Sequence, residues 1–319
     1  MTVPAALPPG LAVRPATFDD ASAVCALLNE IDVLEIGRAD TDLDDIQADL
    51  KHPELDLEHD SWLLFDDGRL IAYGLLWDES GGERIDAEYY TLPDRPLASE
   101  YLLDLMEARC AELAAANGAD RAVVHLELGI TPTLDLRVMR GRGWTPVRRY
   151  NAMVRPLSTA ADRLPEPPPG VTLRSCLDEA DRRRAHALIQ DAFTEHFDFH
   201  PRTYEQWLDD IDAEHADWSL MWIAHVEGVG DAAVLHTRNN RASMAWIGHI
   251  GVLRQARGRG LGSYLLRHAF GHYADLGRDR IGLGVDTGNS SGALALYERH
   301  GMTRDYAVQT WELIRPVVR

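Results

Sequence analysis

The sequence has few cysteines. The three that it contains, Cys25, Cys110 and Cys176, lie far apart and form no C-x-x-C pair. An odd number of widely spaced cysteines excludes a disulfide framework and a zinc ribbon of the usual spacing. We therefore expect a protein of the reducing cytoplasm.

Positive charge is scarce as well. The chain has 32 Lys and Arg residues against 51 Asp and Glu residues, a net charge of −19 at pH 7, and Lys51 is its one lysine. Nucleic acids and anionic membranes are bound largely through clusters of lysine and arginine. The charge balance argues against both as main partners, so we expect neither.

Long apolar runs are absent. No stretch approaches the roughly 20 apolar residues that cross a bilayer, and the first residues, MTVPAALPPG, lack the basic region and apolar core of a signal peptide. The hydrophobic fraction of 45% and the charged fraction of 26% are those of a folded protein. At 319 residues the chain is long enough for two domains.

The two halves of the chain resemble each other. Near the start of each half, an apolar strand ending in arginine (Arg14 or Arg174) leads through acidic residues into an amphipathic helix. Residues 99–121 match 262–280, and residues 136–157 match 296–313. A repeat this long indicates duplicated domains. Between the halves, LSTAADRLPEPPPG forms a stiff proline-rich linker. We therefore predict domains at 11–157 and 171–319, joined by a linker at 158–170.

In the second half, the pattern predicts strands at 171–175, 219–226, 231–237, 243–252, 279–285 and 303–312. It predicts helices within 178–213 and at 261–276 and 291–300. This order indicates an α/β protein with a mixed central sheet flanked by helices.

The string RGRG occurs twice, in MRGRGW at 139–144 and in ARGRGLG at 256–262. The repeat places the first copy opposite ERHG in the second half, so that Gly143 corresponds to Gly301. The two copies are therefore unrelated positions. We interpret the first as a helix C-terminal cap with exposed arginines, which leaves the second as the candidate anion site.

The second copy joins a strand to a helix. Glycines let the backbone approach an anion, and the N–H groups of a helix's first turn have no partner within the helix, so the loop suits a pyrophosphate. A Walker loop would need G-K-[ST], which is absent, and a dinucleotide fingerprint would need glycine where Ser263 stands. The remaining pattern is R-x-x-G-x-G, met by Arg257, Gly260 and Gly262.

A second motif, NSSGALALYERHGM, follows with Asn289 27 residues after Gly262. Together the two motifs resemble the GCN5-related N-acetyltransferase (GNAT) family, which carries R-x-x-G-x-G after its fourth strand and N-…-A-x-x-L-Y-x-x-x-G-F later. The resemblance covers about residues 171–313, and the whole chain is similar to the tandem-domain branch that includes mycothiol synthase. Two departures are a spacing of eight residues from Asn289 to Tyr297, where seven is commoner, and Met302 in place of phenylalanine.

The resemblance implies two tandem GNAT domains and acetyl-CoA as co-substrate. Backbone groups of Ile250, Gly251 and Val252 would hydrogen-bond the pantetheine and face the thioester carbonyl, and Asn289 would contact the cofactor's arm. The pyrophosphate would lie on the amides of Arg257, Gly258, Arg259, Gly260, Leu261, Gly262 and Ser263.

The resemblance also implies that Tyr297 lies near the sulfur as general acid. Amine attack on a thioester develops an oxyanion that fixed N–H donors stabilise, and a phenol can protonate the leaving thiolate. An amine with a pKa of about 10 is mostly protonated at pH 7, so a proton acceptor helps.

For that acceptor we choose His249 on the fourth strand, although its alternation with Val252 points it to the other face of the sheet unless a bulge intervenes. His225, Glu227 and His236 on neighbouring strands are alternatives. Mycothiol synthases place a glutamate on this strand, and ASMAWIGHIG has none, which counts against that narrower assignment.

The segment FTEHFDFHPRTYEQW at 193–207 is the expected acceptor wall, because the helices after the first strand border the acceptor cleft in the family. Its candidates are Phe193, His196 and His200, to which we add Trp246 of the fourth strand. His196 and His200 have i,i+4 spacing, but no third ligand is near and Pro201 ends the helix. We therefore expect a polar pocket lining and no metal.

The first half lacks the loop motif. Opposite residues 257–262 it has Asp94, Arg95, Pro96, Leu97, Ala98 and Ser99, and Met139 stands opposite Tyr297. Proline removes an amide donor and aspartate repels phosphate, so we interpret this half as a degenerate supporting copy.

The sequence therefore predicts an acetyl-CoA-dependent N-acetyltransferase that acts on a small-molecule amine by direct attack in a ternary complex, as a monomer or homodimer. The alternatives are a mycothiol synthase-type acetyltransferase and a non-catalytic protein that binds acyl-CoA or has a regulatory role.

Overall fold

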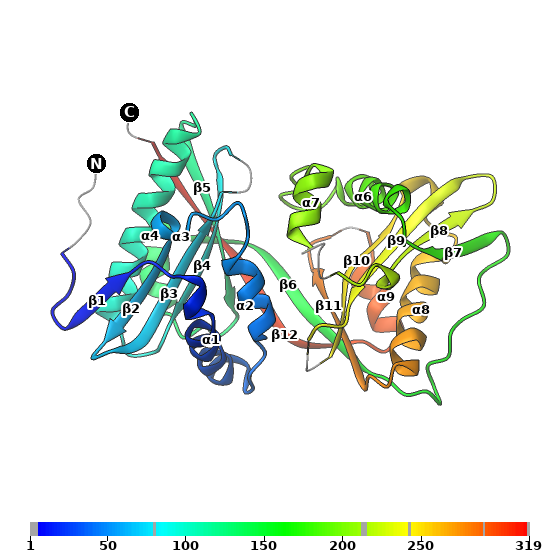
Figure 1. Ribbon diagram of the computed structural model, residues 1–319, viewed down its shortest axis with the longest axis horizontal. Helices are drawn as coiled ribbons and strands as arrows, with labels where there is room; N and C mark the ends of the chain where they lie inside the picture. Colours follow the sequence, from blue (N-terminus) through cyan, green and yellow to red (C-terminus); the bar gives the residue numbers. More distant parts are fainter. Residues whose placement is uncertain (1–5, 79–80, 212–215, 242–243, 290, 318–319) are drawn as a thin grey trace. The chain divides into compact units, whose positions relative to one another are not determined.

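The computed structural model describes residues 6–78, 81–211, 216–241, 244–289 and 291–317. The chain divides into two compact units (Figure 1). Unit 1 consists of Met1–Arg149 and Ala307–Arg319, and unit 2 of Tyr150–Tyr306.

Unit 1 is a mixed sheet covered on both faces. Its strand order is β1-β2-β3-β4-β5-β12, in which β4 and β5 are parallel and the other neighbours are antiparallel. The strands are β1 (Leu11–Arg14), β2 (Ser61–Asp66), β3 (Arg69–Trp77), β4 (Arg84–Thr91), β5 (Arg121–Gly129) and β12 (Thr303–Pro316). The helices are α1 (Ala21–Ile36), α2 (Leu43–Leu50), α3 (Leu57–Asp60), α4 (Pro96–Ala116) and α5 (Leu136–Gly141). Both α1 and α4 contact β3, which is buried along nearly its whole length because both of its faces are covered.

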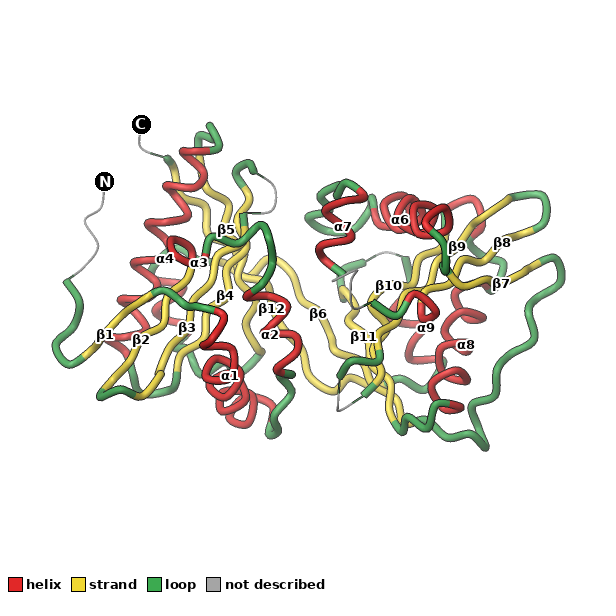
Figure 2. The backbone as a smooth tube through the Cα atoms, viewed as in Figure 1, coloured by secondary structure: helices red, strands yellow, loops and turns green. Residues whose placement is uncertain are grey.

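Unit 2 repeats this plan with the order β6-β11-β10-β9-β8-β7, in which β10 and β11 are parallel. The strands are β6 (Thr145–Pro156), β7 (Val171–Ser175), β8 (Met221–Val226), β9 (Gly230–Arg238), β10 (Ala245–Val252) and β11 (Arg280–Asp286). The helices are α6 (Glu179–Phe193), α7 (Tyr204–Asp210), α8 (Leu261–Asp275) and α9 (Ala293–Arg299). Figure 2 colours these helices and strands. The strands and helices predicted for this half are found, with ends shifted by a few residues; positions 212, 213 and 243 lie outside the described residues.

Side chains of β9 alternate between two cores, as a sheet with two covered faces requires. Val234 belongs to a cluster with residues of α6 and α7, whereas Ala233 and Leu235 belong to a cluster with residues of α8 and α9. The sheet of unit 2 therefore separates an α6 face from an α8 face.

The last strands of the two halves are exchanged. Residues Tyr150–Pro156 of β6 pair with β11 and complete the sheet of unit 2, and residues Val308–Pro316 of β12 pair with β5 and complete unit 1. The boundaries expected from the repeat, 11–157 and 171–319, place each strand in its own half, whereas the compact units do not. The physical reason is that the two strands occupy equivalent positions in the repeat. When they are exchanged, each sheet receives the counterpart of its own last strand.

The segment expected as a linker, 158–170, contains no helix or strand. Its chain lies against α8, where a Cβ on Gly271 would come within 2.6 Å of the Leu164 backbone nitrogen. The segment is therefore docked on unit 2 by a close approach that only glycine permits.

The backbone supports the alignment of the first RGRG with ERHG. Gly143 and Gly301 both follow the last helix of their half and both have positive φ, 96° and 80°. In each half the residue after this glycine donates its N–H to the carbonyl five positions earlier. Trp144 donates to Met139 O and Met302 donates to Tyr297 O, both at 3.1 Å. The first RGRG is thus a helix C-terminus.

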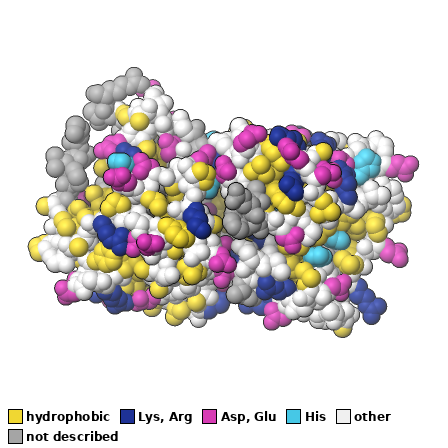
Figure 3. Space-filling view, in the orientation of Figure 1, with side chains coloured by type: hydrophobic (Ala, Val, Ile, Leu, Met, Phe, Trp, Pro, Cys, Tyr) yellow, Lys and Arg dark blue, Asp and Glu magenta, His cyan; other side chains and the backbone are white. Residues whose placement is uncertain are grey.

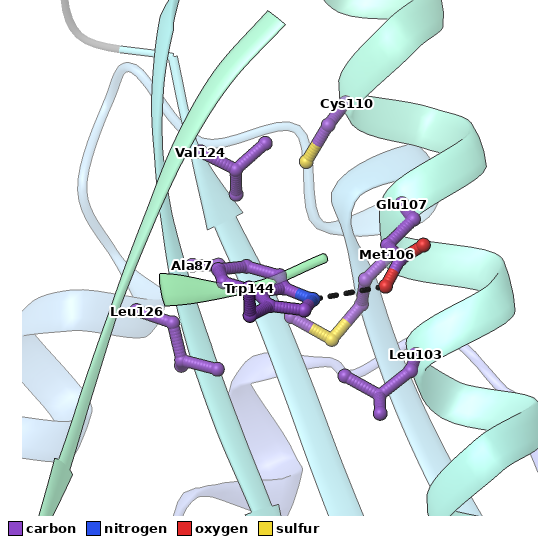
Figure 4. A pocket seen from close by; sticks show the side chains of 8 residues that line it. All are labelled: Ala87, Leu103, Met106, Glu107, Cys110, Val124, Leu126 and Trp144. Atoms are coloured by element: carbon purple, nitrogen blue, oxygen red, sulfur yellow. Dashed lines mark hydrogen bonds between the residues drawn. The ribbon is translucent and has the colours of Figure 1, made fainter. Parts of the chain in front are cut away.

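Its arginines were expected to be exposed, and for Arg142 this is wrong. Arg142 donates to Glu107 at 2.8 Å through Nε and is also paired with Asp104. Glu107 is buried on α4 and also accepts from Trp144 Nε1 at 3.0 Å (Figure 4). It accepts from Arg315 of β12 at 2.7 Å as well. These donors hold the pKa of Glu107 below its usual value against the effect of burial. The small cavity beside them, about 10 Å³, is lined by the residues drawn in Figure 4 and is at most the size of one water.

Acidic and basic side chains are interspersed on the face drawn in Figure 3, which shows no continuous basic surface. Across the described ranges, no helix combines the length and the apolar character that crossing a membrane demands.

Candidate active site

The strands β10 and β11 separate after a short contact. They pair over Ala245–Ile247 only, while β10 continues to pair with β9 as far as Val252. Leu253 N–H donates to Ala232 O of β9 at 2.9 Å. Because alternate residues of a strand direct their backbone groups to opposite sides, the N–H groups of Ile250 and Val252 face the gap on the β11 side. The three residues predicted to hold the pantetheine therefore offer an open strand edge.

The glycine loop follows this edge directly. Gly258 and Gly260 have φ of 77° and 78°, a left-handed conformation that favours glycine, and Gly260 caps α8 without a side-chain bond. The N–H groups of Leu261, Gly262 and Ser263 find no acceptor among the described residues, as expected of a helix's first turn. Together with the helix dipole they form an anion site.

Gly262 also sets how closely α8 and α9 approach, because a Cβ there would lie 3.2 Å from Leu296 Cδ2. The neighbouring Ser263 makes a bond that the sequence did not suggest: its Oγ lies 2.7 Å from His300 Nε2, at the end of α9.

The side chain of Arg257 closes the end of β10. Its Nε donates to Val252 O at 3.1 Å and its Nη1 lies 3.2 Å from Glu195 Oε2. Arg254 pairs with the same glutamate at 3.5 Å, and both Arg254 and Arg259 are exposed. Sequence reasoning missed Glu195, because the 62 residues that separate it from Arg257 give no local signal.

Tyr297 is buried on α9, with 6% of its surface exposed, in the cluster that covers the α8 face. Burial raises the pKa of its phenol to about 12. Its hydroxyl makes no hydrogen bond within the described part of the chain. The phenol therefore stays protonated at neutral pH and has a proton to donate.

Asn289 lies against the expected acceptor wall. Its Oδ1 accepts from Ser291 N–H at 2.8 Å, and its Nδ2 lies 3.2 Å from His196 Nε2. The structure thus joins a residue predicted for the cofactor to one predicted for the acceptor.

Three expected residues meet on the α6 face. The ring of Phe193 lies 4.3 Å from that of His196 and 5.5 Å from that of His249, measured between centroids. The bulge of β10 falls between Ile247 and His249. It therefore leaves the alternation between His249 and Val252 intact, and His249 faces α6 as that alternation predicts.

His249 contacts a second histidine, His236 of β9, with the two Nδ1 atoms 3.3 Å apart. Burial lowers the pKa of His249 to about 4, assisted by Arg238 and His196. The pKa of His236 is lowered well below its usual value by burial, His249 and Arg238. Both rings are neutral at physiological pH.

The remaining candidates lie elsewhere. His200 is exposed, with Nδ1 3.0 Å from Asp198 O, and no group of three or more potential metal ligands occurs in the described ranges. His225 pairs with Asp231 near the β8–β9 turn. Met221, the β8 residue that is the register partner of His236, lies at the other end of that strand. Trp246 packs across Gly282 and carries the Arg241 guanidinium 4.7 Å above its ring.

Comparison with known proteins finds similar acetyltransferases. Residues 183–302 match the sequence model of the Acetyltransferase (GNAT) family. The mycothiol acetyltransferase of Salinispora tropica is 31% identical over 218 residues, which are 63% of this chain and 65% of that protein. Residues 183–302 thus form a domain of the GNAT family. The Thermobispora bispora mycothiol acetyltransferase is also 31% identical, over 53% of this chain and 58% of that protein. The matched segments thus span less than two thirds of the length of these two relatives.

Solved GNAT structures extend the likeness over the whole chain. A GCN5-related N-acetyltransferase from Sphaerobacter thermophilus superposes with a TM-score of 0.81 at 25% identity, covering 98% of each chain. A tandem GNAT protein from the clavulanic acid biosynthesis pathway has a TM-score of 0.68 at 15% identity, covering 95% of this chain and 98% of its own. The fold is therefore that of two tandem GNAT domains.

The GNAT fold of unit 1 keeps the strand gap but not the loop. Strands β4 and β5 pair only over Arg84–Ala87, and Pro96 begins α4 where the second half has glycines. The Ser99 hydroxyl is bonded to Tyr89 at 2.6 Å, and the Ser99 N–H donates to Arg95 O. The first turn of α4 thus lacks the glycines and, at Pro96, one amide donor. The Ser99 N–H bond is the ordinary first bond of the helix, which Tyr264 N–H to Gly260 O provides in α8.

Proposed function

We propose that this GNAT protein is an acetyl-CoA-dependent N-acetyltransferase that transfers the acetyl group to the amine of a small molecule by direct attack in a ternary complex. The observation that carries the proposal is the continuity of unit 2: the open edge of β10 leads directly into a left-handed glycine loop and three unpaired helix amides. One elongated ligand with a polar arm and a pyrophosphate matches that sequence of groups.

In this proposal, the edge at Ile250, Gly251 and Val252 holds the pantetheine arm, and the N–H of Val252 faces the thioester oxygen, where negative charge develops during amine attack. The amides from Gly258 to Ser263 hold the pyrophosphate, and Asn289 contacts the arm. The N–H of Arg257, expected in this set, already donates to Arg254 O at 3.3 Å. Acetyl-CoA supplies the activated acyl group. Tyr297, whose phenol is buried and protonated at neutral pH, donates its proton to the departing thiolate.

Before attack, the acceptor must lose a proton. We assign this step to His249, which is neutral and stands on the α6 face beside Phe193 and His196. The acceptor wall is proposed around Phe193 and His196, which lie beside His249. Of the other two residues expected in it, His200 is exposed and Trp246 packs across Gly282. The acceptor is a small amine, and neither nucleic acid nor a membrane is expected as a partner.

A second candidate is the reaction named for the curated relatives, acetylation of the mycothiol precursor's amine. The 31% identity to two mycothiol acetyltransferases favours it. Against it, β10 carries no glutamate. A non-catalytic protein that binds acyl-CoA is the third candidate.

The decisive experiment measures thiol release from acetyl-CoA with a panel of amines that includes the mycothiol precursor. Amine-dependent release with formation of the acetylated amine supports an N-acetyltransferase, and preference for the precursor selects the second candidate. Tight acetyl-CoA binding without turnover of any amine would leave the non-catalytic reading. We propose the cytoplasm as compartment, supported by the free thiols of Cys25, Cys110 and Cys176, and a monomer or homodimer as assembly.

A further inference from the structure

His236 and His249 form a side-by-side pair across β9 and β10. Their rings are nearly parallel, with an interplanar angle of 14° and centroids 5.6 Å apart, and the two residues are register partners. With their Nδ1 atoms 3.3 Å apart, one nitrogen must carry a hydrogen and the other must accept it, because two lone pairs or two N–H groups would repel. Each ring therefore fixes the tautomer of the other.

The pair is asymmetric. His236 is buried, with 7% of its surface exposed, whereas His249 is partly exposed and borders Phe193 on the α6 face. A ligand on that face can reach His249 but not His236. His249 is thus the outer member of the pair and His236 the inner one.

The bulge of β10 makes room for this arrangement. Gly248 stands at the bulge, and a Cβ there would lie 3.2 Å from His236 Nδ1, the atom that faces His249. Any larger residue at 248 would press on the contact between the two rings.

His196 does not compete for the same role. The Oδ1 of Asn289 is occupied by Ser291 N–H, so the Nδ2 side of the amide faces His196 and donates to its Nε2. His196 Nε2 is therefore an acceptor already in use. Neither His249 Nε2 nor His236 Nε2 has a hydrogen bond in the described residues, and of these two rings only that of His249 is partly exposed.

We propose that His236 is a positioning residue that holds His249 in the Nδ1–H tautomer and directs the Nε2 lone pair of His249 toward the acceptor amine. This inference rests on the proposed function. The N–H bond of the acceptor's ammonium breaks, the proton forms a bond to His249 Nε2, and the electron pair stays on the amine nitrogen, which attacks. His249 becomes an imidazolium whose Nδ1–H still donates to His236, and the proton then passes to solvent.

Burial disfavours the protonated form of His249, and the charged groups around the pair add to this effect. Arg238 follows on β9 and His196 lies on the α6 side, and both disfavour the imidazolium together with burial. A base in this setting does not retain the proton between turnovers, so the acid limb of the turnover profile lies below that of an ordinary histidine.

The first test reads the tautomer itself and needs no substrate. In the full chain labelled with ¹⁵N-histidine, we expect His249, assigned by loss of its signals in His249→Phe, to carry hydrogen on Nδ1. His236→Phe keeps the ring and removes the acceptor, so the Nδ1–H population of His249 should fall. A His249 that is protonated on Nε2 in the parent, or unchanged in His236→Phe, would overturn the inference.

The second test is kinetic. His236→Phe should lower kcat roughly ten- to a hundredfold with acetyl-CoA affinity unchanged, and should change the acid limb of the pH profile. His236→Asn, whose Oδ1 can accept from His249 Nδ1–H, should restore part of the rate, which a purely structural role would not explain. His268→Phe is the matched control, because His268 is a histidine of the α8 face whose pKa burial lowers to about 4.

The two levels of failure are distinguishable. If no amine is acetylated by the parent chain, the proposed function fails, while the tautomer measurement still decides whether His236 orients His249. If the parent is active and His236→Phe turns over at the parent's rate, the positioning role fails and the proposed function stands. Where His236→Phe does not fold, His236→Asn and the parent's spectrum decide the question.

Discussion

Ser263, in the first turn of α8, is bonded to His300, at the end of α9, with Oγ and Nε2 2.7 Å apart. This bond joins the two motifs that define the site. Burial lowers the pKa of His300, and the guanidinium groups of Arg267, Arg299 and Arg155 lower it further. In a chain with a net charge of −19, this is a concentrated group of basic side chains beside the unpaired helix amides, where the phosphates of acetyl-CoA are expected.

We therefore expect acetyl-CoA binding to depend on the protonation of His300. A phosphate beside the ring favours the imidazolium and raises its pKa on binding, so affinity should increase as the pH falls, by roughly three- to tenfold between pH 8 and pH 6. Calorimetric titration at both pH values measures the change. The ligand's own phosphate monoester titrates near pH 6, so His300→Gln is the control, and equal pH dependence in parent and variant would refute the role.

Tyr297→Phe should keep acetyl-CoA affinity and lower turnover roughly ten- to a thousandfold, the range that general acids supply. The reason is that the phenol is buried, protonated and without a hydrogen-bond partner in the described residues. Replacing it with phenylalanine therefore removes the proton donor and breaks no hydrogen bond. Single-turnover kinetics and equilibrium binding measure the two quantities. Tyr273→Phe, which removes a buried hydroxyl bonded to Thr237 at 2.8 Å, should affect stability and spare turnover. Unchanged chemistry in Tyr297→Phe would exclude the tyrosine.

One acetyl-CoA should bind per chain, in unit 2. Gly260→Glu places a carboxylate and a strained side chain at the anion site and should abolish binding. The repeat aligns Gly260 with Leu97, which is 65% exposed, so Leu97→Glu is the matched control; Ala98 is 2% exposed, and its replacement would test stability instead. Calorimetry should return a stoichiometry near one for the parent and Leu97→Glu. A value near two, or loss of binding in Leu97→Glu alone, would reverse the assignment of the units.

Glu107→Ala should destabilise unit 1 by about 3 kcal/mol, because it leaves the buried donors of Arg142, Trp144 and Arg315 without their acceptor. Denaturant unfolding measures the loss. Glu112→Ala on the same helix removes an exposed carboxylate 3.3 Å from Arg109 and should change stability by less than about 1 kcal/mol. Equal effects of the two substitutions would show that Glu107 does not hold the exchanged strand.

Stability should fall in mild acid. The pKa values of His249 and His268 are lowered to about 4 in the fold, whereas an unfolded histidine binds its proton near pH 6.5. Between these values the unfolded chain holds more protons, so stability is fully present above about pH 6.5 and decreases as the pH drops toward 4. Thermal unfolding from pH 7.5 to 4.5 follows the loss. His268→Phe should make the dependence shallower, and an unchanged slope would contradict the assignment.

The anion loop was predictable because its determinants are local. A strand running into Gly258 and Gly260 and then into an amphipathic helix already specifies left-handed turns and unpaired amides, and the structure has both. The orientation of His249 followed from alternation for the same reason. Its partner did not, because His225, Glu227 and His236 were equivalent in the sequence, and only the register of β9 with β10 brings His236 Nδ1 to 3.3 Å.

The sequence by itself determined the repeat, the α/β order, the place of the glycine loop and its loss in the first half, since each depends on residues close together in the chain. Tertiary structure alone decided that β6 completes unit 2 and β12 completes unit 1. The two strands are counterparts in the repeat, so the repeat alone does not specify which sheet each strand completes. Which edge each one occupies depends on contacts with distant residues, such as that of Arg315 with Glu107, 208 positions away, and no local pattern distinguishes the two pairings.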